Sequence, residues 1–362
     1  AELTSPRGYS GKVVRVGILG TGKIAQDFSL AIQDVAEAKI VAVGSRSKES
    51  SLQFGQSFEI PESNCFSSYE DLAKAPEIDL IYIATPHSFH YAHCKLCFEN
   101  NKNVLCEKAL TLNAKQSQKL VEIAREKKLF FMEAMWTRYL PCYEYLARHI
   151  LPKLGNIRMA RATFGFSDPG VQRLSDPALG GGAILDIGVY TVNFCSIAFG
   201  DRPITKIQAT GIVDDNNIDS ELSATLSFEG AENDPLNTAL GQMYCSFNAT
   251  LPCEGLIVGE KGFVCVHEPF WCSTKLSVKL HENGPAAPQE IRFAKPNSND
   301  QSKYNFRNSV LLQYEARHAC QQILKGEKES SIFSLDDSVR IMKILDELRD
   351  QLGVTYPDET LQ

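Results

Sequence analysis

The sequence has no long apolar run, no strong excess of charge of one sign and no apolar secretory leader. No run approaches the ~20 apolar residues that span a bilayer, so we expect no membrane partner. A net charge of −7 over 362 residues indicates a mildly acidic surface, which argues against a nucleic-acid partner. Residues 1–12 are polar, and we therefore expect a flexible lead-in to a cytoplasmic protein.

Clusters that would bind a metal are also scarce. The eleven cysteines are an odd number spread along the chain, which indicates free thiols in a reducing compartment. Cys94 and Cys97 have the CxxC spacing, but no second pair follows at the spacing of a zinc site. His87, His90 and His93 do not converge on one helix face, and no carboxylate cluster matches them. The sequence therefore predicts no metal site.

Short apolar runs alternate with amphipathic stretches in the first 135 residues. The runs at 13–19, 39–43, 79–84, 103–106 and 129–132 predict buried strands. Helices are expected over 24–35, after a capping box formed by Ser67 and Glu70, over 91–100 and over 113–127. This alternation predicts an α/β fold in which residues 1–135 form a Rossmann domain, a doubly wound parallel sheet covered on both faces.

The pattern changes after about residue 158. A helix is expected over 182–199, followed by strands over 204–213, 221–228, 241–248, 254–258, 263–267 and 275–280. Two helices, over 308–324 and 334–352, close the chain and could pack back on the first domain. Because the strands follow one another directly, residues 136–362 are predicted to form an α+β domain around an open, mostly antiparallel sheet. A length of 362 residues suits two such domains.

A glycine motif follows the first predicted strand. Residues 20–25 read GTGKIA and fit GxGxxA, directly before a predicted helix. Gly20 permits a tight turn, and Gly22 lets a pyrophosphate approach the backbone at the helix N-terminus. The motif predicts a dinucleotide site, and the alternative is a plain glycine turn.

The end of the second predicted strand lacks the acidic residue that usually binds the ribose of NAD. Residues 44–48 read GSRSK. Arg46 can pair with a 2′-phosphate, and the hydroxyls of Ser45 and Ser47 can add hydrogen bonds. This favours NADP as the cofactor. The alternative is that Arg46 is an ordinary surface arginine.

Two further segments carry candidates for chemistry. Glu107 and Lys108 follow the predicted strand at 103–106, at the sheet edge where ligands bind, and Lys108 can stabilise a developing alkoxide. Asp186 and Tyr190 lie four residues apart after a triple glycine, so they project from one helix face. Tyr190 can serve as a general base. The alternative is a core tyrosine whose hydroxyl is bonded to Asp186.

Together these segments resemble one enzyme family. The stretches GTGKIA at 20–25, CEKA at 106–109, EAMWTRYLP at 133–141 and GGGAILDIGVY at 180–190 resemble the glucose–fructose oxidoreductase/inositol dehydrogenase (Gfo/Idh/MocA) family. Further similar stretches occur at 270–276, 314–318 and 352–357, so that the resemblance spans nearly the whole chain. Within the family the chain is most similar to the branch that oxidises dihydrodiols and D-xylose with NADP.

The resemblance implies roles for individual residues. Lys108 is the catalytic lysine, and Tyr190 stands where many members have histidine. The resemblance places residues in or at the border of the substrate pocket at Trp136, Arg138, Phe164, Trp271 and Phe306. We expect cofactor contacts from Gly20, Thr21, Gly22, Lys23, Ile24, Ser45, Arg46, Ser47, Thr85, Pro86, His87, His90, Glu107, Lys108, Trp136 and Arg138. The family's second sheet commonly forms a dimer interface, so a homodimer is expected. Ala109 departs from the family's usual proline, and the backbone after Lys108 therefore lacks the restraint of a ring.

The resulting hypothesis is a hydride transfer from a hydroxyl of a cyclic trans-dihydrodiol or an aldose to NADP. Tyr190 takes the hydroxyl proton, Lys108 stabilises the charged oxygen and lowers the pKa of Tyr190, and Asp186 orients one of these groups or a second hydroxyl. Three alternatives stay open: a keto-sugar reductase of the same family, a non-catalytic regulator that senses dinucleotide, and a glycosidase that retains NAD.

Overall fold

The computed structural model describes residues 11–168, 170–230, 236–284, 286–296, 301–357 and 359–360. Most of the lead-in expected over residues 1–12 lies outside these ranges. Among the described residues, one helical stretch, Pro177–Phe199, has the length and hydropathy of a membrane span. Because 94% of its most apolar window is buried inside the protein, it has the character of a core helix.

Six parallel strands form the first sheet; the sequence predicts five of them and misses the two-residue strand at Cys65–Phe66. They are β1 (Val14–Leu19), β2 (Ala38–Gly44), β3 (Cys65–Phe66), β4 (Leu80–Ile83), β5 (Asn103–Glu107) and β6 (Phe131–Ala134). The order β3-β2-β1-β4-β5-β6 is that of a Rossmann fold. All four residues of β4 are buried, because helices cover both faces of the sheet.

Five helices connect these strands. They are α1 (Lys23–Ile32), α2 (Lys48–Ser57), α3 (Tyr69–Lys74), α4 (His87–Glu99) and α5 (Ala114–Lys127). Two expected starts are wrong by one to four residues. Ser68 rather than Ser67 caps α3, through the amide of Asp71. Helix α4 begins at His87 instead of residue 91, because Pro86 occupies the N-cap and its polar first turn gives no apolar periodicity.

Eight strands form the second sheet. They are β7 (Ile157–Gly165), β8 (Ile204–Val213), β9 (Asp219–Glu229), β10 (Thr238–Ser246), β11 (Gly255–Gly259), β12 (Gly262–Val266), β13 (Lys275–Leu280) and β14 (Gln289–Arg292). Their order is β14-β13-β12-β11-β7-β10-β9-β8, and all pairs are antiparallel except β7–β10. The sequence prediction missed β14 and the central strand β7, in which two of the buried residues are alanines with little apolar signal.

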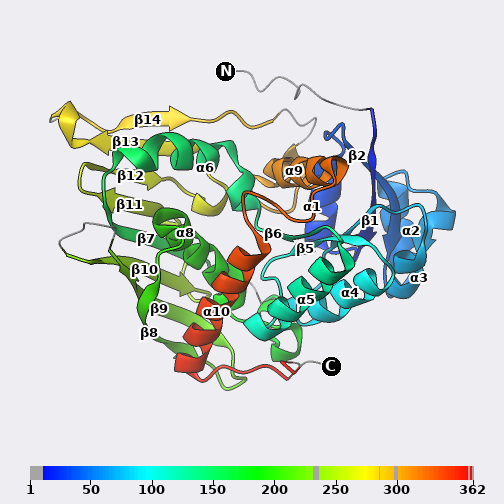
Figure 1. Cartoon of the computed structure of the whole chain (residues 1–362). Coiled ribbons are helices and arrows are strands. Elements are labelled where there is room, and N and C mark those ends of the chain that lie inside the picture. Colours follow the sequence, from blue (N-terminus) through cyan, green and yellow to red (C-terminus); the bar gives the residue numbers. More distant parts are fainter. Residues whose placement is uncertain are drawn as a thin grey trace.

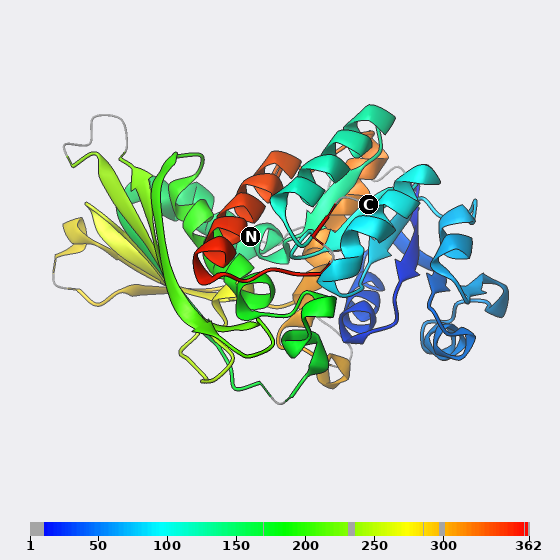
Figure 2. The same cartoon turned by 90° about the horizontal axis from the view of Figure 1, so that it is seen from below.

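The remaining helices lie between and around the sheets. They are α6 (Pro141–Tyr145), α7 (Gln172–Ser175), α8 (Val189–Phe199), α9 (Leu312–Lys325) and α10 (Leu335–Leu352). Helix α8 packs on β7 and β10, and α10 packs on both α5 and α8, so that α10 lies between the two sheets (Figures 1 and 2). Helix α9 packs on α1. The division of the chain at residues 135 and 136 stays a prediction.

The helix expected over 182–199 starts with a wider turn. Residues Ile184–Gly188 form a π-helical turn, and α8 follows without a break. Gly182 has φ +118° just before this turn, a conformation that favours glycine. An added Cβ there would lie 2.2 Å from the Oδ1 atom of Asp219. The triple glycine therefore lets the start of the helix approach β9 closely.

Candidate active site

The glycine turn after β1 leaves an open helix N-terminus. Gly20 has φ +104°, and a Cβ atom there would lie 2.9 Å from the carbonyl oxygen of Ala84. Gly22 is the N-cap of α1 and provides no side-chain cap, and a Cβ at Gly22 would meet nothing within 4 Å. The first amides of α1, in the segment with Lys23 and Ile24, are therefore open to an anion, as a pyrophosphate requires.

A second anion-binding segment follows β2. Ser47 caps α2 by accepting from the amide of Ser50 at 3.3 Å, and the Ser45 hydroxyl accepts from the amide of Ser47 at 3.3 Å. Arg46 is exposed between these two serines. Burial raises the pKa of Tyr69, and the neighbouring Arg46 partly offsets this increase. Residues 44–48 present a cation and two hydroxyls without a carboxylate, which suits a phosphate on the ribose, and Glu49 follows in the first turn of α2.

Lys108, at the end of β5, contacts the π-helical turn that precedes α8. Its Nζ atom donates to the backbone oxygen of Asp186 at 2.7 Å and to Oδ1 of the same residue at 3.3 Å. The same nitrogen lies 5.0 Å from the centre of the Tyr190 ring. The predicted residues Lys108, Asp186 and Tyr190 thus come together, although 78 residues separate the first two.

Arg173 is a second cation beside Asp186, and the sequence analysis did not identify it. Its guanidinium donates to Oδ1 of Asp186 at 2.7 Å. Burial alone would raise the pKa of Asp186, but Lys108 and Arg173 lower it below its ordinary value, so the carboxylate stays ionised. Arg173 lies on the four-residue helix α7, and no motif in the sequence connects it to Asp186.

The hydroxyl of Tyr190 is bonded to Trp136, not to Asp186 as the alternative reading expected. The indole Nε1 of Trp136 donates to the Tyr190 oxygen at 2.8 Å. Burial and the nearby Glu107 raise the pKa of Tyr190 well above its ordinary value, and the Trp136 hydrogen bond offsets only part of this rise. Burial dominates, so the expected lowering by Lys108, which is bound to Asp186, does not bring this pKa below its ordinary value.

Glu107 lies behind Lys108 in the core. Its carboxylate accepts from the hydroxyl of Tyr82 and from the amide of Lys108, the latter at 3.3 Å. Tyr82 in turn stacks on Phe28 of α1, with ring centres 3.7 Å apart. Burial raises the pKa of Glu107. These contacts fix the end of β5 relative to α1, and they give Glu107 a positioning role.

Two histidines hold the loops around Lys108. His87 donates from Nδ1 to the carbonyl oxygen of Gly180 at 2.9 Å, and burial lowers its pKa to about 3, so it is neutral at pH 7. The ring nitrogens of His90 lie 2.9 Å from the oxygen of Ala109 and 2.7 Å from that of Thr85. Ala109 is fully buried, and the Lys108–Ala109 peptide bond is cis. Packing and His90 therefore hold the segment after Lys108 in the absence of proline.

Thr85, Pro86 and Thr21, which are also expected to contact the cofactor, lie in the loops that follow β4 and β1. Pro86 is the N-cap of α4, and the hydroxyl of Thr85 lies 3.0 Å from Nδ1 of His93. Thr21 lines a shallow hollow between α1 and α2. The structure therefore places Thr85 and Pro86 at the carboxyl end of β4, next to the glycine turn after β1.

An aromatic wall borders Tyr190. Phe164 stacks on Trp271 with ring centres 3.7 Å apart and planes 12° apart, and the Tyr190 ring lies 5.9 Å from Phe164. The hydroxyl of Thr137 donates to the backbone oxygen of Trp271 at 2.6 Å, which fixes the loop that carries this side chain. Phe164, Trp271 and Trp136 thus border the tyrosine, and their place in a substrate pocket stays a prediction.

Arg138 and Phe306, which are expected at the substrate pocket or its border, form hydrogen bonds with helices α8 and α1 respectively. The guanidinium of Arg138 donates to Asn193 at 2.6 Å and to Ser196 at 3.1 Å, both on α8, and it lies over the ring of Phe333. These contacts occupy the side chain with protein partners. Phe306 is 45% exposed, and its amide donates to Asp27 of α1 at 2.9 Å, so it lies at the border of the site near the start of α1.

Comparisons with known proteins agree with this geometry. Residues 14–135 match the model of an oxidoreductase family with an NAD-binding Rossmann fold, and residues 152–265 match the GFO/IDH/MocA C-terminal domain. The chain is 38% identical over 345 residues to trans-1,2-dihydrobenzene-1,2-diol dehydrogenase from Xenopus tropicalis, which covers 94% of this chain and 98% of that protein.

Two solved structures share the fold. Levoglucosan dehydrogenase in complex with NADH and levoglucosan has a TM-score of 0.80 at 18% identity, over 96% of this chain and 100% of that one. A 3-ketoreductase from Actinomadura kijaniata in complex with NADP and TDP-benzene has a TM-score of 0.76 at 20% identity, over 94% of this chain and 98% of that one. At these identities the likeness concerns the fold alone.

The ion pairs of Asp186 generate a prediction on stability. Arg173→Gln removes one of two cations from a buried carboxylate and should lower the free energy of unfolding by about 1–2 kcal/mol at neutral pH. The loss stays below that of a fully buried pair because the Arg173 side chain is 39% exposed. Since folding lowers the pKa of Asp186, this contribution is present above the ordinary pKa of a carboxyl group and disappears as the pH falls below it.

Denaturant unfolding at several pH values measures this difference. The matched control is Arg148→Gln, which breaks the exposed pair of Arg148 and Glu144 and should cost no more than about 0.5 kcal/mol. Equal losses in the two variants would contradict a stabilising role for Arg173.

Proposed function

The chain belongs to the GFO/IDH/MocA family of oxidoreductases, and we propose that it is an NADP-dependent dehydrogenase that oxidises a hydroxyl group of a cyclic trans-diol or an aldose. A dehydrogenase with a nicotinamide cofactor follows from the family and from the curated relatives. The choice of NADP and the class of substrate are the parts that we propose. We also propose that the protein is a cytoplasmic homodimer. Light scattering, which measures the mass in solution, tests the dimer.

One observation carries the proposal. The Tyr190 ring and the Lys108 ammonium come from different halves of the chain, and the ammonium lies 5.0 Å from the ring centre at the carboxyl end of β5, beside the glycine turn. Asp186 and Arg173 hold this pair, and aromatic rings border it. A proton-transfer group next to a fixed cation is the arrangement that oxidation of an alcohol requires.

The residues divide the work of the reaction. A nicotinamide held at the glycine turn would supply the acceptor for the hydride from the carbon that carries the reacting hydroxyl. In its deprotonated form Tyr190 takes the proton of this hydroxyl and becomes neutral, and the indole N–H of Trp136 stabilises the negative tyrosine oxygen before the transfer. Lys108 stabilises the negative charge on the substrate oxygen, and the ionised Asp186 keeps the lysine in place.

The aromatic wall supports a substrate with a flat or apolar face. The rings of Phe164 and Trp271 can pack against a cyclic diol or against the apolar face of a sugar ring. The relative from Xenopus tropicalis is named for a cyclic diol, which agrees with this choice. The segment at Ser45, Arg46 and Ser47 supports NADP, because it offers a cation and hydroxyls to a 2′-phosphate.

A second candidate is the reverse reaction, the reduction of a keto-sugar. Burial raises the pKa of Tyr190, which keeps its hydroxyl protonated and able to donate a proton to a carbonyl oxygen. An assay with NADP⁺ or NAD⁺ and a panel of aldoses and cyclic trans-diols distinguishes the two candidates, because the dehydrogenase would produce the absorbance of the reduced nicotinamide.

No reduction of the nicotinamide across the panel, combined with oxidation of NADPH by keto-sugars, would favour the reductase. No turnover in either direction would favour a dinucleotide sensor.

The proposed roles of Tyr190 and Lys108 can be tested by substitution. Tyr190→Phe and Lys108→Met should each lower kcat by about 10²-fold or more, because each removes a group that acts in the transition state. The Kd for NADP, measured by calorimetry, should stay nearly unchanged in both. Turnover close to wild type in either variant would remove that residue from the mechanism.

The hydrogen bond of Trp136 predicts a change in pH dependence. Trp136→Phe removes a contact that lowers the pKa of Tyr190, so this pKa should rise further above its ordinary value. Because oxidation needs the deprotonated oxygen, its rate near neutral pH should fall about tenfold and its pH–rate profile should move to higher pH. Keto-sugar reduction uses the protonated form and should show no such fall. An unshifted profile would argue against Tyr190 as the base.

Cofactor choice depends on Arg46 in this proposal. Arg46→Glu should lower the ratio of kcat/KM for NADP over NAD by about 10–100-fold, because a carboxylate repels the 2′-phosphate and can accept from a ribose hydroxyl. Lys39→Glu, an equal charge change on the exposed part of β2, serves as the control and should leave the ratio unchanged. A wild-type ratio in Arg46→Glu would contradict the proposed phosphate contact.

A further inference from the structure

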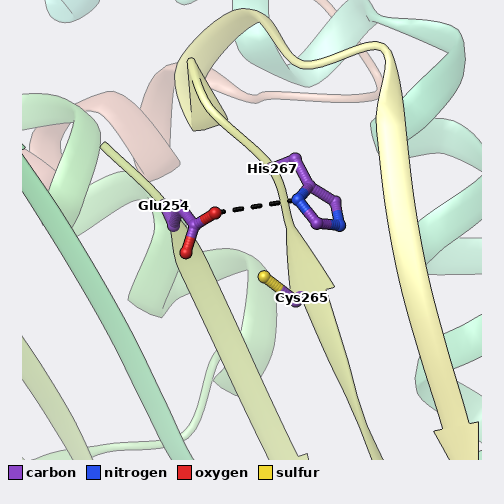
Figure 3. A group of neighbouring side chains, drawn as sticks. All are labelled: Glu254, Cys265 and His267. Carbon is purple, nitrogen blue, oxygen red and sulfur yellow. Dashed lines mark ion pairs between the residues drawn. The ribbon is translucent and has the colours of Figure 1, made fainter. Parts of the chain in front are cut away.

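The second sheet carries a cluster of metal-ligating side chains away from the site described above. Cys265 lies in β12, His267 follows this strand, and Glu254 precedes β11. Their ligand atoms, the sulfur, a ring nitrogen and a carboxylate oxygen, all lie within 4.8 Å of one another. Figure 3 shows the three side chains pointing toward one another from the two neighbouring strands.

Strand pairing places these residues on one face. Strands β11 and β12 are antiparallel, and Gly255 pairs with Val266, so Glu254 comes next to His267. Cys265 and His267 are two residues apart and therefore point to the same side of the sheet. This is the face opposite the core, because Val264 and Val266 are fully buried while Cys265 is partly exposed.

The donor set is one that zinc prefers. A thiolate, an imidazole and a carboxylate bind Zn²⁺ at ~2.0–2.3 Å, which in a tetrahedral site places the ligand atoms about 3.3–3.6 Å apart. The Nδ1 atom of His267 lies 3.7 Å from Oε1 of Glu254, close to this spacing. Small rotations of partly exposed side chains suffice to bring in the sulfur.

A hydrogen bond orients the histidine for this role. The Nε2 atom of His267 lies 2.7 Å from the hydroxyl oxygen of Ser277 on β13. When Nε2 carries the ring proton and donates it to Ser277, the lone pair of Nδ1 points at Glu254 and is available to a metal. A hydrogen bond from the ring nitrogen that does not bind the metal is typical of histidines that bind zinc.

We propose that Glu254, Cys265 and His267 form a Zn²⁺ site on the outward face of the second sheet. The site would connect β11 to β12 at the point where the chain leaves for the Trp271 loop, four residues after His267. Because Zn²⁺ binds the thiolate and not the thiol, binding releases the thiol proton, and the affinity falls as the pH falls.

Titration with Co²⁺ as a probe tests the site directly. The full-length protein, freed of metal with a chelator, should bind one Co²⁺ per chain with a thiolate-to-metal charge-transfer band and tetrahedral visible bands, and Zn²⁺ should displace both. Cys265→Ser should abolish the charge-transfer band, and His267→Ala should weaken Co²⁺ binding at least about tenfold. His281→Ala, at an exposed histidine elsewhere on the sheet, is the matched control and should keep the spectrum.

A second measurement covers the case in which a variant fails to fold. Cys265 is the one cysteine among the eleven that is not buried, so it should react fastest with an alkylating reagent in the wild-type protein. Saturating Zn²⁺ should slow alkylation at Cys265 at least about tenfold, as peptide mass spectrometry measures, and should raise the thermal midpoint.

The outcomes separate this proposal from the catalytic one. Absence of a charge-transfer band, its persistence in Cys265→Ser, or alkylation that Zn²⁺ does not slow would each overturn the zinc site. Because the three residues lie outside the catalytic group, Cys265→Ser and His267→Ala should keep the kcat of the metal-free wild type. If the wild-type protein showed no dehydrogenase activity, the Co²⁺ titration would still test the zinc site, because it measures metal binding and not catalysis.

Discussion

The buried group of Lys108, Asp186 and Arg173 is the interaction on which the arrangement of the site depends. It joins the end of β5 in the first sheet to the turn before α8, which packs on the second sheet. A carboxylate this buried is stable as an ion only with cations beside it, and the two cations in turn are held by it. The position of Tyr190, four residues further on, follows from the same contact.

Around this group, charged and aromatic side chains lie next to each other. The ion pair of Lys108 and Asp186 and the rings of Phe164, Trp271 and Trp136 all border Tyr190. Burial makes each polar contact stronger than it would be in water. The raised pKa of Tyr190 shows the cost of this arrangement, because the same burial that strengthens the contacts opposes the charged form of the tyrosine.

Much of the fold follows from local signals in the sequence. The strands of the first sheet are short apolar runs, and the glycine turn lies where its motif predicts it. The contacts between distant segments have no such signal. Arg173 comes from a four-residue helix, Trp136 reaches Tyr190 over 54 positions, and Cys265 meets Glu254 only because β11 pairs with β12. The direction of the Tyr190 pKa could not be predicted either, since it depends on burial.

The shorter of the two contacts of Lys108 runs to a backbone oxygen, that of Asp186 in the π-helical turn. Widened turns of this kind leave carbonyl groups available to other donors, and they are frequent at functional sites. The main chain supplies this oxygen whatever side chain stands at position 186. The helix backbone therefore supplies the shorter of the two contacts that place the ammonium, and the side chain of Asp186 adds the second contact together with the charge that neutralises it.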